Sequence, residues 1–122
     1  MARLILLNGP PSSGKSTLAR RFVDDHPLAL CLDIDVVRAM LGRWLDRPTE
    51  AGLIAREMAK GMAAVQLEGD RDVIVPQYVG RLPFVEQLDA LAVRTGAAFV
   101  EVALLPSKAA AVAWFARRVT GP

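Results

Sequence analysis

The feature that most constrains this chain is a loop rich in glycine, proline and serine between an apolar run and a helical pattern. Residues 4–8 are almost entirely apolar, which is typical of a strand buried on both faces of a parallel sheet. Residues 15–24 carry Leu18, Phe22 and Val23 at the spacing of one helical face. The loop fits the pattern G-x-x-x-x-G-K-[ST] and consists of Gly9, Pro10, Pro11, Ser12, Ser13, Gly14, Lys15, Ser16 and Thr17. This succession predicts the first unit of an α/β fold.

The loop has the composition needed to bind a chain of phosphate groups. Gly9 and Gly14 allow backbone conformations and a close approach that a side chain would obstruct. The amides of residues 13–16 are expected to point at the phosphates from a helix N-terminus, whose dipole favours anions. Lys15 is predicted to reach the β and γ phosphates, and the Ser16 hydroxyl to bind Mg²⁺.

The other loop residues have weaker predicted roles. Pro10 and Pro11 are expected to stiffen the front of the loop. Thr17 either touches the α phosphate or faces solvent. The alternative for the whole loop is a chance match on a turn, and the flanking strand and helix patterns argue against it.

Beyond the loop, short apolar runs alternate with helical patterns. Further strands are expected at residues 28–32, 72–76 and 98–105, and further helices at 35–41, 49–68, 84–96 and 107–119. This alternation predicts an α/β fold with a parallel sheet. The 122 residues, of which 52% are hydrophobic, suit one domain over residues 1–122 with a packed core.

The helix expected from residue 49 has a predicted buried face. Ile54, Met58, Met62 and Val65 recur at intervals of four, four and three residues, which predicts an apolar stripe. We therefore expect Met58 and Met62 to lie in the core. Thr49 is expected to cap the start of this helix through its hydroxyl.

Asp33 and Asp35 follow the second predicted strand. Alternation along an extended backbone would place both carboxylates on one side and Ile34 in the core. Ligands bind beyond the C-terminal ends of the strands in such sheets, so both carboxylates would face the phosphate loop. We predict that Asp33 supports Mg²⁺ through its waters and that Asp35 accepts the proton of an acceptor hydroxyl. The alternative is that either residue caps the short helix that follows.

Arg38 lies one helical turn after Asp35 and has two interpretations. On the face of Asp35 it can bind a hydroxyl or an anionic group of an acceptor. It can equally form an i, i+3 ion pair on a solvated helix.

Together with residues 72–81, these motifs make the chain resemble the small P-loop kinases of the shikimate, gluconate, chloramphenicol phosphotransferase and zeta-toxin kind, often called AAA-family ATPases. The resemblance covers nearly the whole chain. It implies a three-layer α/β P-loop fold, a sheet in the order 2-3-1-4-5, ATP and Mg²⁺ as cofactors, and phosphoryl transfer to a hydroxyl of a small-molecule acceptor. By this resemblance Asp35 matches the carboxylate that activates the acceptor, and Gln77, Tyr78 and Arg81 fall where the family lines its acceptor pocket.

Two features depart from that family. Many P-loop proteins have an acidic residue at the end of the third strand, where this chain has Pro76 and Gln77, so the metal is left to Ser16 and Asp33. Family members continue past the fourth strand into a helical lid and a fifth strand. Here Arg117 is expected to begin the lid beside the nucleotide, and the fifth strand and the rest of the lid are expected to be missing, which leaves the order 2-3-1-4. The alternative function is a nucleotide-binding module, or an ATPase without an acceptor.

Composition and charge limit the partners. Fifteen Lys and Arg against 13 Asp and Glu give a net charge of only +2, a weak case for nucleic acid. No run of about 18 uncharged apolar residues is present, so no membrane span is expected. The single cysteine, Cys31, fits a reducing cytoplasm. A sheet edge without its fifth strand would favour pairing with a second copy in a homodimer.

Overall fold

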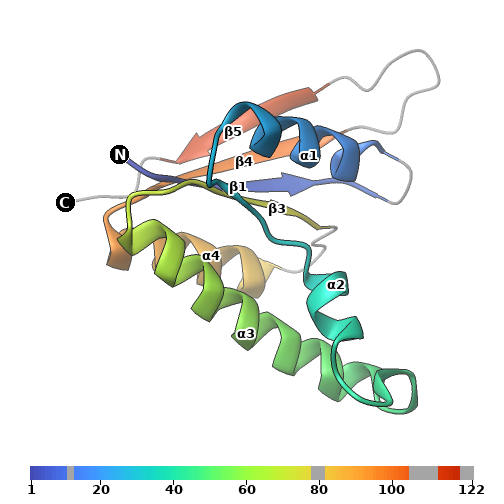
Figure 1. Cartoon of the computed structure of the whole chain (residues 1–122). Helices are drawn as coiled ribbons and strands as arrows, with labels where there is room; N and C mark the ends of the chain where they lie inside the picture. The colour runs from blue at the N-terminus through green and yellow to red at the C-terminus, as the bar shows by residue number, and fades with distance from the viewer. Residues whose placement is uncertain (11–12, 78–81, 105–112, 119–122) are drawn as a thin grey trace.

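The computed structural model describes residues 1–10, 13–77, 82–104 and 113–118, the last of these by their backbone, and shows one sheet with helices on both faces (Figure 1). In chain order the elements are β1 (Arg3–Asn8), α1 (Lys15–Asp25), β2 (Leu30–Cys31), α2 (Ile34–Ala39), a 3-10 turn (Trp44–Asp46), α3 (Pro48–Glu68), β3 (Val73–Pro76), α4 (Leu82–Thr95), β4 (Ala98–Leu104) and β5 (Ala113–Arg118). Helices and strands alternate from β1 to β4, as the apolar runs predict.

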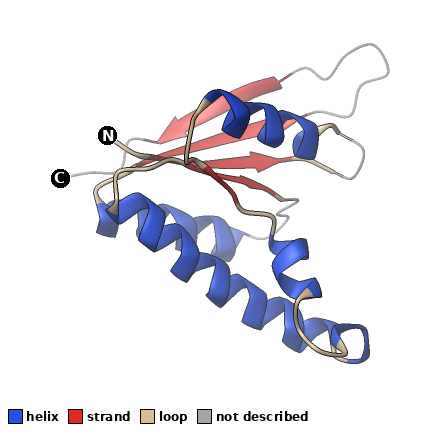
Figure 2. Ribbon diagram, viewed as in Figure 1, coloured by secondary structure: helices blue, strands red, loops and turns tan. Residues whose placement is uncertain are grey.

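The sheet has the strand order β2-β3-β1-β4-β5. Strands β1 to β4 are parallel, and β5 runs antiparallel to β4. Helix α1 covers one face of the sheet, and α3 and α4 cover the other (Figure 2). The predicted three-layer α/β fold and the order 2-3-1-4 are confirmed.

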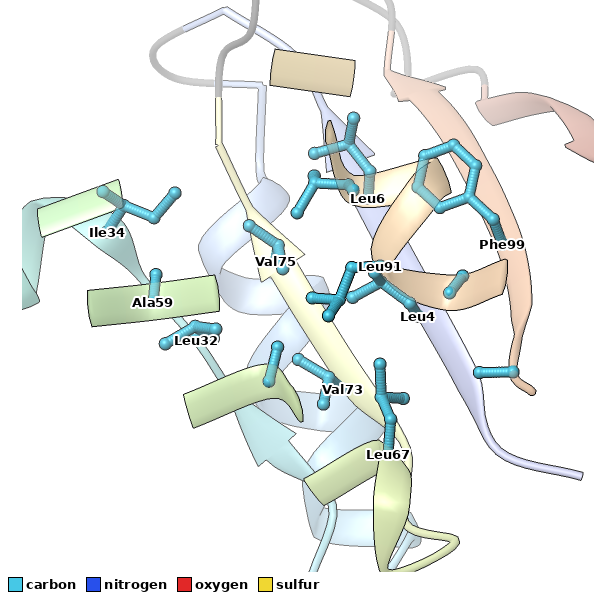
Figure 3. Packing of buried hydrophobic residues seen from close by; sticks show 14 of the residues in the cluster. Leu4, Leu6, Leu32, Ile34, Ala59, Leu67, Val73, Val75, Leu91 and Phe99 are labelled. Carbon is cyan, nitrogen blue, oxygen red and sulfur yellow. The ribbon is translucent and has the colours of Figure 1, made fainter. Parts of the chain in front are cut away.

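The central strands are apolar throughout because both of their faces are buried. On the side of α3 and α4, Leu4 and Leu6 pack with Val73, Val75 and Phe99, as Figure 3 shows. On the side of α1, Ile5, Leu7 and Ile74 pack with Ala19 of that helix. Alternate residues of β1 thus pack into two separate clusters, one on each face of the sheet. This packing fixes the end of β1, from which the loop starts.

The buried face of α3 is not the predicted one. The side chains of Ile54, Met58, Met62 and Val65 are 39% to 65% exposed, so the prediction that Met58 and Met62 lie in the core is wrong. The buried residues of α3 are instead Ala51, Ala55, Ala59, Ala63 and Leu67. This stripe of small residues lies one position along from the predicted stripe. Small side chains let α3 approach α2, α4 and the sheet closely, and the larger residues rotate outward.

The start of α3 also differs from the prediction. The helix begins at Pro48, its N-cap is Arg47, and no side chain caps it, so the predicted Thr49 cap is wrong. Proline suits a first helical position because it has no amide hydrogen to leave unsatisfied. By contrast, the face predicted for α4 is confirmed: Phe84, Val85, Leu88, Leu91 and Ala92 are all buried.

The C-terminal segment forms a strand where a helix was expected. Residues Ala113–Arg118 pair with Leu104 to Phe99 of β4, so the helix predicted over 107–119 and the expected absence of a fifth strand are wrong. Ser107, whose hydroxyl would cap the start of such a helix, lies outside the described residues. A free edge of β4 would have unpaired backbone groups, and β5 satisfies them. The homodimer stays a prediction. The open edge of β4 no longer supports it, because β5 occupies that edge.

Of the helices that the structure describes, none has the length and hydropathy required to cross a membrane.

Candidate functional site

The loop after β1 depends on its two glycines for its shape. Gly14 is the N-cap of α1 and has φ +87°, in the left-handed region that favours glycine. A Cβ atom on Gly9 would lie 2.6 Å from Oγ of Ser13 and 3.1 Å from Cβ of Leu104. The first glycine is therefore required for space and the second for backbone conformation.

Polar groups on the inside of this loop have no partner among the residues that the structure describes. The N-cap Gly14 offers no side chain to the first-turn amides of α1, which also lack acceptors within the helix. The Oγ atom of Ser13 is buried and has no hydrogen-bond partner among the residues described. Free amides and a buried hydroxyl at a helix N-terminus suit a bound anion such as a phosphate group.

Lys15 bends back over the loop. Its Nζ atom donates a hydrogen bond to the carbonyl oxygen of Pro10 at 3.2 Å, and the amide of Ser13 donates to the same oxygen, also at 3.2 Å. No acidic side chain in the described part of the chain pairs with Lys15. Among the described residues, the ammonium group of Lys15 therefore pairs with a neutral carbonyl group and not with a carboxylate. Pro11 and Ser12 lie outside the described residues, whereas Ser16 and Thr17 are exposed on the first turn of α1.

Asp33 and Asp35 do not form the pair that an extended backbone predicts. Helix α2 begins at Ile34, and Asp33 is its N-cap, with Oδ1 accepting a hydrogen bond from the amide of Asp35 at 2.9 Å. The predicted alternation of the two carboxylates is therefore wrong, because the chain turns into a helix between them. Ile34 is buried in the core, as expected. The structure thus confirms the alternative interpretation of Asp33 as a cap, while leaving its other oxygen without a hydrogen bond to any described residue.

Arg38 makes the ion pair that was one of its two interpretations. Its Nη2 atom lies 3.4 Å from Oδ1 of Asp35, whose side chain is 62% exposed. The guanidinium group also stacks over the ring of Trp44 at 4.7 Å from the centroid. The pair and the ring hold Arg38 along α2.

A cleft of about 290 Å³ lies where β2 and β3 end. Helix α1 contributes Ser16 and Arg20, one turn apart on the same face, and the start of α2 contributes Asp33. The cleft therefore brings together the two residues predicted to support a metal ion. Asp35, Arg38 and Gln77 are not among its lining residues.

Apolar residues form the rest of this cleft. Val36 lies in α2, Met40 is the C-cap of that helix, and Met62 lies in α3. None of these three residues was predicted from the sequence to line a site, and neither was Arg20. The spacing of four from Ser16 to Arg20 was a signal for the latter. For Met62 the helical pattern was misleading, since it predicted that this side chain is buried in the core.

Cys31 forms part of the cleft wall at the end of β2. Burial raises the pKa of its thiol above the ordinary value; the nearby Asp33 carboxylate adds to this, and the Arg20 guanidinium opposes it. The thiol therefore shares this cleft with one positive and one negative side chain.

The other predicted positions do not line the cleft or are not described. The amide of Gln77 donates to the carbonyl oxygen of Leu7 at 3.1 Å, so Gln77 follows β3 beside the end of β1. Its Oε1 atom is buried without a partner among the described residues. Tyr78 and Arg81 lie outside the described residues. Arg117 lies in β5 opposite Val100, along the length of β4.

The oxygen donors of the site suit Mg²⁺ rather than a metal held by several protein ligands. Within residues 1–10, 13–77 and 82–104, no group of three or more His, Cys, Asp or Glu side chains could hold a metal ion. The cleft offers one hydroxyl, from Ser16, and one carboxylate, from Asp33. Mg²⁺ keeps several of its waters and needs few protein ligands, so this donor set fits it.

The fold and the loop together define the class of protein, which is a small P-loop protein of the kinase-like kind. The chain belongs to the family described as the AAA domain, whose model matches residues 4–121. No curated protein matches the chain.

Solved structures share this fold at low sequence identity. A chain of the Pnkp1/Rnl/Hen1 RNA repair complex has a TM-score of 0.70 and 21% identity, with 88% of this chain and 35% of that chain covered. The APS kinase CysC of Mycobacterium tuberculosis in complex with AMPPNP and APS has a TM-score of 0.63 and 21% identity, with 84% of this chain and 61% of that chain covered. A candidate kinase from Chloroflexus aurantiacus j-10-fl has a TM-score of 0.67 and 20% identity, with 84% of this chain and 58% of that chain covered. The chain therefore spans less than two thirds of each of these three neighbours, and the likeness shows the fold.

Proposed function

We propose that this protein is a phosphotransferase that moves the γ-phosphoryl group of ATP to a hydroxyl of a small-molecule acceptor, with Mg²⁺ as cofactor. One observation carries the proposal: Ser16, on the first turn after the phosphate loop, and Asp33, at the end of β2, line the same cleft. The APS kinase CysC, which shares the fold, has a structure in complex with AMPPNP and APS, and this supports a nucleotide as a ligand of this chain. With Mg²⁺ and ATP bound, the reaction would form a bond between the acceptor oxygen and the γ-phosphorus and release ADP.

The loop residues would bind the nucleotide. In this proposal the amides at the start of α1 and the Ser13 hydroxyl donate hydrogen bonds to phosphate oxygens. Lys15 exchanges the carbonyl of Pro10, a weak neutral acceptor, for charged phosphate oxygens. Gly9 and Gly14 keep the loop free of side chains that would fill this space.

The two aspartates would have separate duties. Asp33, with one oxygen engaged in the helix cap, would support Mg²⁺ together with Ser16. Asp35 is the proposed base, since its exposed carboxylate can accept the proton of an acceptor hydroxyl. Arg38, which pairs with Asp35, and Gln77 would orient the acceptor beside it.

A binding titration with ATP and Mg²⁺ tests the first half of this proposal. Lys15→Ala should weaken binding at least about tenfold, because it removes the loop cation. Lys60→Ala is the matched control: Lys60 lies on α3, pairs with Glu57 and is outside the cleft, so its variant should bind as the wild type does. Equal binding by folded wild-type and Lys15→Ala protein would refute a nucleotide site at this loop.

A transfer assay tests the second half. With γ-labelled ATP and a panel of alcohols, the wild-type protein should label an acceptor, and Asp35→Asn should lose transfer while keeping nucleotide affinity. Full transfer by Asp35→Asn would refute its role as base. Release of inorganic phosphate at the same rate with and without every acceptor would support an ATPase instead.

A further inference from the structure

We infer that the acceptor is an alcohol with a compact, apolar body, which lies against Val36, Met40 and Met62 in the cleft that Ser16 and Asp33 also line, with its hydroxyl within reach of Asp35, the residue before Val36 in α2. The inference rests on the proposed function for the chemistry at the polar end. It adds the class of acceptor and the residues that select it.

The apolar wall of the cleft is the first support. Val36, Met40 and Met62 are 58%, 66% and 39% exposed, although large apolar side chains are favoured inside a protein. They come from two different helices and border the same cleft. Methionine side chains are flexible and polarizable, so they adapt to apolar ligands of different shape. An apolar ligand would remove part of this surface from water.

The small number of polar side chains is the second support. Of the residues that line the cleft, only Ser16, Arg20 and Asp33 have strongly polar side chains. A sugar or polyol has a hydroxyl on nearly every carbon, and each buried hydroxyl without a partner lowers its affinity. The side chains of the cleft have donors and acceptors for only one or two hydroxyls. It therefore favours an alcohol whose remaining atoms are apolar.

The size and charge of the cleft are the third support. Its volume of about 290 Å³ is close to the lower limit of roughly 300 Å³ for small-molecule pockets, which suits a compact molecule rather than a polymer. One guanidinium, of Arg20, and one carboxylate, of Asp33, balance each other. No net charge in the lining demands a charged ligand body.

Cys31 provides a readout of occupancy that does not depend on phosphoryl transfer. It is the single cysteine of the chain, and it lines the cleft. A ligand in the cleft should slow its alkylation by iodoacetamide, measured by mass spectrometry at one fixed alkaline pH, since alkylation proceeds through the thiolate.

The probes are cyclohexylmethanol and myo-inositol, which share a six-carbon ring and differ in polarity. At about 10 mM, cyclohexylmethanol should slow alkylation at least about threefold and myo-inositol should not. Met62→Ser should lose the protection, because it places a polar group on the apolar wall. Met58→Ser is the matched control, one turn earlier on α3, similarly exposed and outside the cleft. Met40→Ser repeats the test from α2.

The outcomes separate this inference from the proposed function. Protection by cyclohexylmethanol that also persists in Lys15→Ala supports the apolar site, since Lys15 is not part of its wall. Equal protection by myo-inositol, or protection unchanged in both Met62→Ser and Met40→Ser, would overturn the inference. Absence of protection together with Lys15-dependent ATP binding would also overturn it and leave the proposed function standing. Protection without ATP binding would support the cleft and count against the kinase.

Discussion

The carboxylate of Asp33 accepts a hydrogen bond from the backbone amide of Asp35 at 2.9 Å, so two acidic residues only two positions apart have different surroundings. Asp33 closes the start of α2 and lines the cleft. Asp35 lies in the first turn and pairs with Arg38 in solvent. Their contributions to stability and to function are therefore separable by substitution.

Substitutions of Asp33 should separate its cap from its charge. Asn caps helices about as well as Asp, so Asp33→Asn should keep the free energy of unfolding, whereas Asp33→Ala should lose about 1 kcal/mol. Urea unfolding measures this difference. Both variants should bind ATP with a weaker dependence on Mg²⁺, because both lack the carboxylate. If Asp33→Ala and Asp33→Asn are equally stable, the cap does not contribute.

Alanine should have opposite effects at two glycines. Gly14 has φ +87°, so Gly14→Ala should lower the free energy of unfolding by about 1–2 kcal/mol through backbone strain. Gly52 lies in α3 with open space around the added methyl group, so Gly52→Ala should raise it by about 0.5–1 kcal/mol. Urea unfolding of the two variants beside the wild type tests both signs. Equal stability of the two would contradict the strained position of Gly14.

The exposed and buried faces of α3 should respond differently to a change of volume. Ala63 is fully buried, so Ala63→Leu should overpack the contact and cost about 1–3 kcal/mol. Met58 is exposed, so Met58→Ala should change the free energy of unfolding by about 0.5 kcal/mol or less. Thermal unfolding of both proteins checks this. A larger loss for Met58→Ala than for Ala63→Leu would mean that the predicted stripe is the buried one after all.

The Arg3–Asp72 pair should make stability depend on acid pH. Burial by itself raises the pKa of the Asp72 carboxyl, but hydrogen bonds of 2.8, 3.2 and 2.6 Å from Arg3, together with its charge, outweigh burial and lower that pKa. The unfolded chain then binds this proton at a higher pH than the folded one. The stabilisation is present above the unfolded pKa and is lost as the pH falls through the folded pKa.

Asp72→Asn tests this effect. The variant should be less stable than the wild type at neutral pH, and the difference should shrink below about pH 4, as the wild-type carboxyl becomes protonated. Asp24→Asn, at an exposed position of α1, is the control for removing one negative charge. Urea unfolding at three pH values gives the comparison. A constant difference between Asp72→Asn and the wild type at all three would contradict the assignment.

Local patterns predicted much of the architecture. The strand, loop and helix from β1 to α1 follow from residues close in sequence: an apolar run, two glycines and a helical face. The buried face of α4 was also predicted from its apolar spacing, whereas the parallel order 2-3-1-4 was implied by the family resemblance. The failures occurred where local patterns conflict with long-range contacts. Residues 107–119 fit a helical pattern, yet residues 113–118 pair with an available edge of β4.

The sequence by itself determined the phosphate loop, since the requirements on Gly9, Gly14 and Lys15 are local and leave few other conformations. Only the tertiary structure decided which face of α3 is buried, because the distance between packed helices depends on all of their side chains together and favoured the alanines. That rotation left Met62 lining the same cleft as Ser16 and Asp33. The conformation of the loop thus depends on residues that are neighbours in the sequence, whereas the proposed acceptor wall depends on how the helices pack in the folded chain.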